Sequence, residues 1–158
     1  MKRHAISLTK SVLILAIILL PASVFGQTIP GVAGAGTGAF PLGTIFSGVP
    51  LSALQFGIGA FIPGDSTAAG ELQATLLGVS LLGQPLSMEL DGHATNGTLN
   101  ADGSRTISGT ATLNLGDGSP ILTNVPFTAT ANATAILLAI ENTNLPAVPL
   151  SGGTITTQ

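Results

Sequence analysis

The chain of 158 residues contains no cysteine, no tryptophan and no tyrosine. Without cysteine, an exported form has neither disulfides nor a thiol for lipid attachment, so its stability must come from packing. Without tryptophan or tyrosine, it also lacks the rings that most often stack on sugars. Charged residues make up 7% of the chain, while 45% is hydrophobic and much of the rest is Gly, Thr, Ser and Asn. This composition indicates a folded domain with a nearly neutral, hydroxyl-rich surface rather than a disordered chain.

Positive charge is especially scarce. Three of the four Lys and Arg residues lie among the first ten positions, and Arg105 is the fourth. If the first segment is removed, the chain keeps seven acidic residues and only one basic residue, Arg105. Its formal net charge is then −6 with His93 neutral. Binding to nucleic acid requires several Lys or Arg side chains on one surface. The sequence therefore excludes nucleic acid and an anionic membrane surface as partners.

The first 26 residues have the layout of a secretory signal peptide. Lys2, Arg3 and Lys10 precede an apolar run over 12–20, and small residues follow Pro21. The run is too short for a membrane span, which needs roughly 20 residues. We predict cleavage after Gly26 and a secreted mature chain, located in the periplasm, at the cell surface or outside the cell. No membrane insertion of the mature chain is expected.

Residues 27–50 form a segment rich in Gly, Ala and Pro. Its glycines at 34, 36 and 38 resemble a phosphate-binding loop in spacing only, since no lysine follows and no strand-then-helix pattern surrounds them. We predict a flexible arm or an irregular edge strand here.

From residue 51 to 158 the hydrophobic pattern has a period of two, which is typical of half-buried strands. Turn signals recur every ten to fifteen residues, so we predict an all-β antiparallel domain, either a β-sandwich or a small β-barrel. Residues 71–82 are a more continuous apolar run, expected to be buried on both faces or bent at Gly78. Residues 132–142 fit a strand or a short helix, and the unbroken alternation favours the strand. The clearest strands are predicted at 54–62, 85–94, 106–115, 124–135 and 151–158.

Small aliphatic residues occupy the predicted inner faces. On 106–115 the apolar set is Ile107, Gly109, Ala111, Leu113 and Leu115, and on 124–135 it is Val125, Phe127, Ala129, Ala131 and Ala133. Such a lining suits two closely packed sheets, or a barrel with room for a small apolar ligand.

Two Asp-Gly-Ser clusters, at 102–104 and 117–119, could be calcium ligands or turns. A calcium loop counted from Asn100 would end at Ala111, which cannot bind a cation. The two carboxylates also lie at opposite ends of one predicted strand, about 35 Å apart at the usual rise. Asp-Gly is a strong turn signal, so we predict turns at both places and a local ion pair between Asp102 and Arg105.

His93 is the one histidine after the first segment, and Asp91 shares its predicted face. No nucleophile elbow, HExxH motif or recognisable carboxylate pair accompanies them. We therefore predict a solvated histidine and a protein that is not an enzyme, with no cofactor and no metal site.

The last candidate is a threonine face formed by Thr110, Thr112, Thr128 and Thr130. Threonine suits any exposed strand position, but a regular array of hydroxyls and methyls could also bind an ordered surface. We predict an exported, non-enzymatic domain with a structural, adhesive or matrix role, associating with itself or with a neutral polymer. The alternative is a carrier for a small apolar ligand in a β-barrel cavity.

Overall fold

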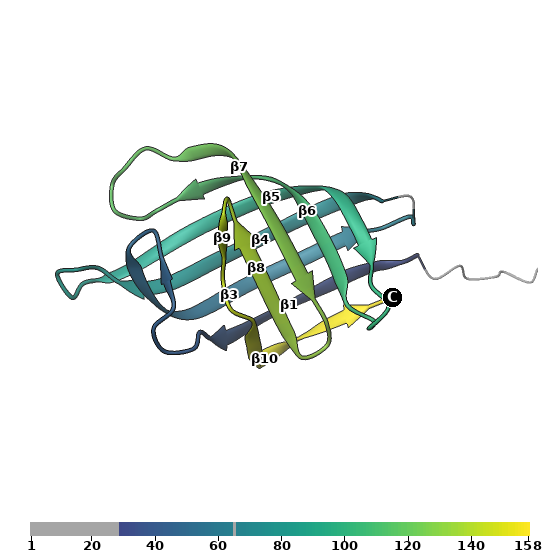
Figure 1. Ribbon diagram of the computed structural model, residues 1–158, viewed down its shortest axis with the longest axis horizontal. Coiled ribbons are helices and arrows are strands. Elements are labelled where there is room, and N and C mark those ends of the chain that lie inside the picture. Colours follow the sequence, from purple (N-terminus) through teal and green to yellow (C-terminus); the bar gives the residue numbers. More distant parts are fainter. Residues whose placement is uncertain (1–28, 65) are drawn as a thin grey trace, which may run out of the picture.

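The structure, a computed structural model, describes residues 29–64 and 66–158. These residues form ten strands and no helix, which confirms the predicted all-β antiparallel class (Figure 1). The predicted signal peptide and Asp65 lie outside the described residues. The strands are β1 (Gly31–Ala39), β2 (Ile45–Phe46), β3 (Val49–Phe61), β4 (Thr67–Val79), β5 (Pro85–Leu99), β6 (Arg105–Asn114), β7 (Leu122–Ala131), β8 (Ala135–Ile140), β9 (Thr143–Asn144) and β10 (Val148–Thr157).

All of the strand pairs are antiparallel, in the order β1-β10-β8-β7-β6-β5-β4-β3-β2, with β9 beside β8. β1 also pairs with β3, so the series of pairings returns to the strand at which it starts. Figure 1 shows β7 and β8 crossing in front of β3 and β4.

β1 corrects the prediction of a flexible arm or an irregular edge strand. It has a partner on each side, β10 and β3, and its one irregularity is a register shift between Thr37 and Gly38. Its glycines allow this close pairing. A Cβ on Gly34 would lie 2.7 Å from the Cα of Ile155, and one on Gly38 would meet the Pro149 carbonyl. The glycines therefore allow the backbones of neighbouring strands to lie close together, whereas the sequence pattern suggested that they make the segment flexible.

The predicted inner faces of β6 and β7 are largely confirmed, although Gly109 and Leu115 are only half-buried and one residue, Ala133, is exposed. Ile107, Ala111 and Leu113 are buried, as are the matching positions of β7. Inward side chains from all eight long strands join one buried cluster. Ala133 is exposed because it lies in the turn between β7 and β8.

The same turn explains why residues 132–142 form a turn and a strand, not a helix. The Asn132 side chain accepts hydrogen bonds from the backbone N–H groups of Thr134 and Ala135, at 2.9 and 3.0 Å. Asn132 thus ends β7 and starts β8, and the preferred strand over this segment is confirmed. The asparagine caps a turn between strands, not a helix.

Residues 71–82 differ from the expected strand with two buried faces. β4 alternates, with Leu72, Ala74 and Leu76 buried and Glu71 and Gln73 exposed. The apolar run looks continuous because two leucines follow the strand, in the turn that leads to β5.

The strand directions give the molecule two distinct ends (Figure 1). The connections 40–48, 80–84 and 115–121 lie together at one end, here called the leucine end. The start of β1, the end of β3 and the end of β10 lie at the other, here called the groove end.

Candidate functional site

The predicted threonine face lies on the outer side of β6 and β7, but it is not a regular array. Thr110 and Thr112 are exposed, whereas Thr128 and Thr130 are half-buried. In the register of the two strands, Thr110 is opposite Pro126, so threonine does not face threonine there.

The hydroxyl of Thr130 also has an internal partner. It lies 2.8 Å from the hydroxyl of Thr106, which in turn accepts a hydrogen bond from the Asn100 amide at 2.9 Å. Thr154 and Thr156, which have the same Thr-x-Thr spacing, belong to β10, where their partners on β1 are Ala35 and Ala33. The threonine pattern therefore falls on separate parts of the surface.

His93 is exposed on the outer face of β5, as predicted for a solvated histidine. Its cross-strand partners are Glu71 on β4 and Thr110 on β6. The sequence suggested Asp91 as its neighbour and gave no reason to select Glu71, which is 22 positions earlier. The structure finds no group of three or more His, Asp or Glu residues placed to bind a metal ion within its described ranges.

Both Asp-Gly-Ser clusters form turns, with Gly103 and Gly118 at φ values of +84° and +85°. The Ser104 hydroxyl and backbone N–H donate to the Asp102 carboxylate, at 2.7 and 2.9 Å. These hydrogen bonds favour the ionised form, the hydroxyl most strongly, and lower the pKa of Asp102. The side chain and backbone of Ser119 lower the pKa of Asp117 in the same way.

Arg105 does not form the ion pair with Asp102 that the sequence suggested. Its guanidinium donates to the backbone oxygens of Gly103, Ser104 and Gln158, with Nε and Nη2 both reaching Gln158 at 3.1 and 2.9 Å. Both Ser104 hydrogen bonds end on Oδ1 of Asp102, and the arginine ties the β5–β6 turn to the end of β10.

A shallow trough runs along the outer face over β3. Its floor includes Gly57 and Gly59, where a Cβ would meet no atom within 4 Å. One part, of about 560 Å³, extends towards Glu71 and His93, and a second, of about 530 Å³, extends towards β1 and the bulge of β10. Glycine at outward strand positions was the sequence signal for this trough, since such positions usually carry a side chain.

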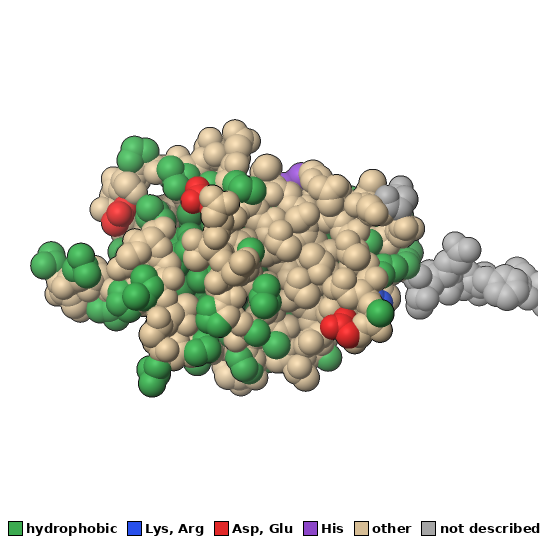
Figure 2. Space-filling model, in the orientation of Figure 1, with side chains coloured by type: hydrophobic (Ala, Val, Ile, Leu, Met, Phe, Trp, Pro, Cys, Tyr) green, Lys and Arg blue, Asp and Glu red, His purple; other side chains and the backbone are tan. Residues whose placement is uncertain are grey.

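Exposed aliphatic side chains gather at the leucine end (Figure 2). Leu42 is fully exposed, and Leu81 and Leu82 retain 92% and 88% of their accessible surface. Ile45, Ile121 and Leu122 are also exposed there. The continuous apolar run at 71–82 indicated a strand for the two adjacent leucines, so the sequence pattern did not predict this apolar surface.

The backbone of the turn at 80–84, here called the leucine turn, is closed without help from the side chains of Leu81 and Leu82. Gly83 N–H donates to the Ser80 carbonyl at 2.9 Å, and Ser80 N–H donates to the Gln84 carbonyl at 2.8 Å. Leu81 and Leu82 stand between these bonds, at positions where Gly, Asn, Asp or Ser are usual. Folding of the turn therefore does not require leucine.

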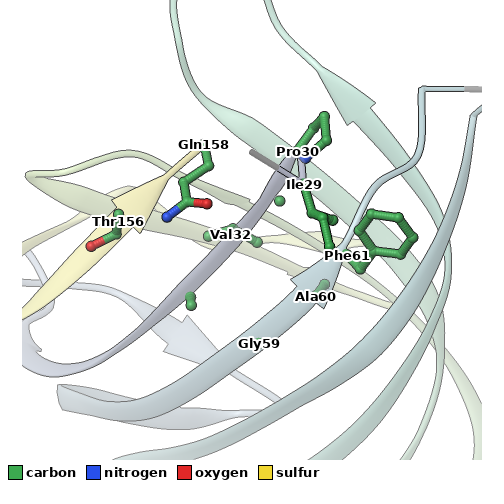
Figure 3. Close-up of a pocket in the computed structure, with 10 residues that line it drawn as sticks. Ile29, Pro30, Val32, Gly59, Ala60, Phe61, Thr156 and Gln158 are labelled. Carbon is green, nitrogen blue, oxygen red and sulfur yellow. The ribbon is translucent and has the colours of Figure 1, made fainter. Parts of the chain in front are cut away.

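A small apolar groove lies at the groove end (Figure 3). Its volume is about 250 Å³, and its lining includes Ile29, Pro30 and Phe61 as well as Thr156 and Gln158 of β10 and its end. Gly59 and Ala33, which are paired across β3 and β1, form the floor of the groove. Ile29 and Phe61 keep 59% and 42% of their accessible surface, so this groove is open to a partner.

No known protein family, curated protein sequence or solved structure matches the chain. Across residues 29–64 and 66–158 there is no helix with the length and hydrophobicity to cross a membrane.

Proposed function

We propose that this chain is an exported, non-enzymatic domain with a structural, adhesive or matrix role at or outside the cell envelope. It acts by surface association, with copies of itself or with a neutral polymer. The observation that carries this proposal is the pair of uncharged apolar surfaces, the leucine turn and the groove, on a domain with very few charges.

The exposed leucines give the proposal its energetic basis. Complete burial of one leucine side chain contributes roughly 1.5–3 kcal/mol. Leu81 and Leu82 gain almost none of this within the fold, because nearly all of their surface is in solvent. An apolar surface that folding does not use is typical of an interaction site.

We further propose that the domain is a small barrel rather than a sandwich. The support is the additional β1–β3 pairing, which joins the first and last parts of the sheet. A closed sheet has few free edges, and this favours association through loops and outer faces over strand addition. The carrier alternative has less support, since inward side chains of all eight long strands form one buried cluster.

The arrangement around His93 supports a role without catalysis. His93, Glu71 and Asp91 are all exposed on the open outer face. General acid–base catalysis is favoured by a site that positions the reacting groups and excludes water, and this face is open.

The proposal is tested by expressing the full chain in an exporting host and recovering the secreted protein. N-terminal sequencing should give Gln27 as the first residue. Sedimentation velocity over a wide concentration range, and cosedimentation with insoluble neutral polysaccharides, should then reveal self-association or polymer binding. A secreted protein that stays monomeric and binds none of the polymers would contradict the proposed function.

A further inference from the structure

We propose that copies of this chain associate head to tail, with the Leu81–Leu82 turn of one copy inserted into the groove beside Ile29 and Phe61 of the next. The proposal rests on the self-association in the proposed function and names the two surfaces that perform it.

The turn has the properties of an inserting element. It projects at the leucine end, its two leucines are almost fully exposed, and its backbone hydrogen bonds hold it in shape (Figure 1). None of the residues 80–84 is charged. A preformed turn of this kind loses little conformational entropy on binding.

The groove matches the turn in size and chemistry. One methyl or methylene group fills about the volume of a water molecule, ~30 Å³, so the eight side-chain carbons of two leucines need about 240 Å³. The groove offers about 250 Å³ between Ile29, Pro30 and Phe61. Its lining contains no charged side chain, so inserting the turn desolvates no charge.

The distribution of charge favours contact between opposite ends. Asp117 lies in the 115–121 connection at the leucine end, so two leucine ends in contact would bring two aspartates together. At the groove end, Arg105 is bonded to the backbone of Gln158, which lines the groove. Head-to-tail contact therefore keeps two copies of Asp117 apart, and it places Asp117 towards the end that holds Arg105, the one arginine among the described residues, together with Asp102.

The two surfaces also lie at opposite ends of the longest axis (Figure 1). One copy that donates its turn still has a free groove, so the contact repeats. A heterologous contact that does not close into a ring produces an open filament. This is the geometry expected of a matrix or structural protein.

Two variants of the secreted full-length product test the contact from its two sides. Leu81→Ser with Leu82→Ser removes the apolar turn side chains, and Leu42→Ser is the matched control on another connection of the same end. Gly59→Val fills the groove floor, and Gly57→Val is the matched control on the same strand. Both glycines have open space at Cβ and neither has a positive φ, so both valines fit the fold.

Sedimentation velocity should show concentration-dependent oligomers for the wild type and both controls. The turn variant and the groove variant should each need at least about tenfold more protein to associate. A 1:1 mixture of these two variants should form dimers and nothing larger, because one keeps a groove and the other keeps a turn.

Several results would overturn the proposal. One is a test variant that associates as strongly as the wild type, while the wild type still assembles or binds a neutral polymer. That result would contradict the head-to-tail contact but not the proposed function. Another is a wild type that remains monomeric but binds phosphatidylcholine vesicles through Leu81 and Leu82, which assigns the turn to a lipid surface. A monomer that binds neither polymers nor vesicles overturns both proposals.

Discussion

Hydrogen bonds from single side chains stabilise the turns between strands, and the Asp102 turn between β5 and β6 is an example. Its carboxylate accepts two hydrogen bonds from Ser104, and Asn100 donates to the Ser104 hydroxyl at 2.9 Å. The Asp-Gly sequence predicts a turn, since glycine accepts a positive φ. It does not predict that Ser104 donates twice to one carboxylate oxygen, or that Arg105 binds the backbone of Gln158.

This network gives a prediction on acid titration. The pKa of Asp102 is lowered by Ser104, first by its hydroxyl and then by its backbone N–H. In a carboxyl ¹³C NMR titration, Ser104→Ala should therefore raise the pKa of Asp102 towards its usual value. Asp117 depends on Ser119 and serves as an internal control that should not move.

The sign of the pH effect on stability follows from the same shift. A lowered pKa in the folded state favours folding above the unfolded pKa of about 3.9. That contribution is lost as the pH falls through the lowered value. Thermal unfolding between pH 2 and 6 should therefore show a smaller acid-induced decrease in Tm for Ser104→Ala than for the wild type. An equal decrease would contradict the assignment.

At the scale of a strand, glycines that look alike in the sequence have opposite roles. Gly70 faces the backbone of β3, where a Cβ would meet the Gly59 carbonyl and the Ala60 Cα. Gly57 faces open space on the neighbouring strand. A glycine in a strand signals a special environment, but its partner strand determines which one.

The corresponding prediction compares two alanine substitutions. Gly70→Ala should lower the free energy of unfolding by about 1–3 kcal/mol, because the backbone of β3 must move to admit the methyl group. Gly57→Ala should be neutral, or stabilising by about 0.4–1 kcal/mol, because it restricts the unfolded chain. Urea denaturation of both variants provides the comparison, and equal stabilities would show that β3 and β4 are not so closely paired.

For the whole molecule, β1 has the largest consequence, since it links β3 to β10. Nine residues of β1 have partners on β3, from Gly31 opposite Phe61 to Ala39 opposite Ala53. Without β1, both neighbouring strands would expose a long edge.

We therefore predict that deletion of residues 27–39 abolishes cooperative thermal unfolding, monitored by circular dichroism at a β-sheet wavelength. Ala35→Thr, an outward change on the same strand, is the control and should preserve the transition. If the shortened chain unfolds as cooperatively as the wild type, the segment is a dispensable arm and the β1 pairings do not support the fold.

Features that depend only on neighbouring residues can be predicted from the sequence. The period of two assigns Ile107 to the interior and Thr110 to the surface, because successive side chains of a strand point to opposite faces. The Asp-Gly pairs mark turns for an equally local reason, the positive φ of Gly103 and Gly118.

Contacts between residues far apart in the chain can be read from the folded structure alone. The fold placed Glu71 beside His93, inserted β1 between β3 and β10, and set the leucine turn at the opposite end from the groove. The register between strands depends on how all of the inner faces pack together, so it cannot be predicted from a short stretch of sequence. The candidate surfaces are products of that register, and this is why the sequence pattern selected the threonines and missed Leu81, Leu82 and Gly59.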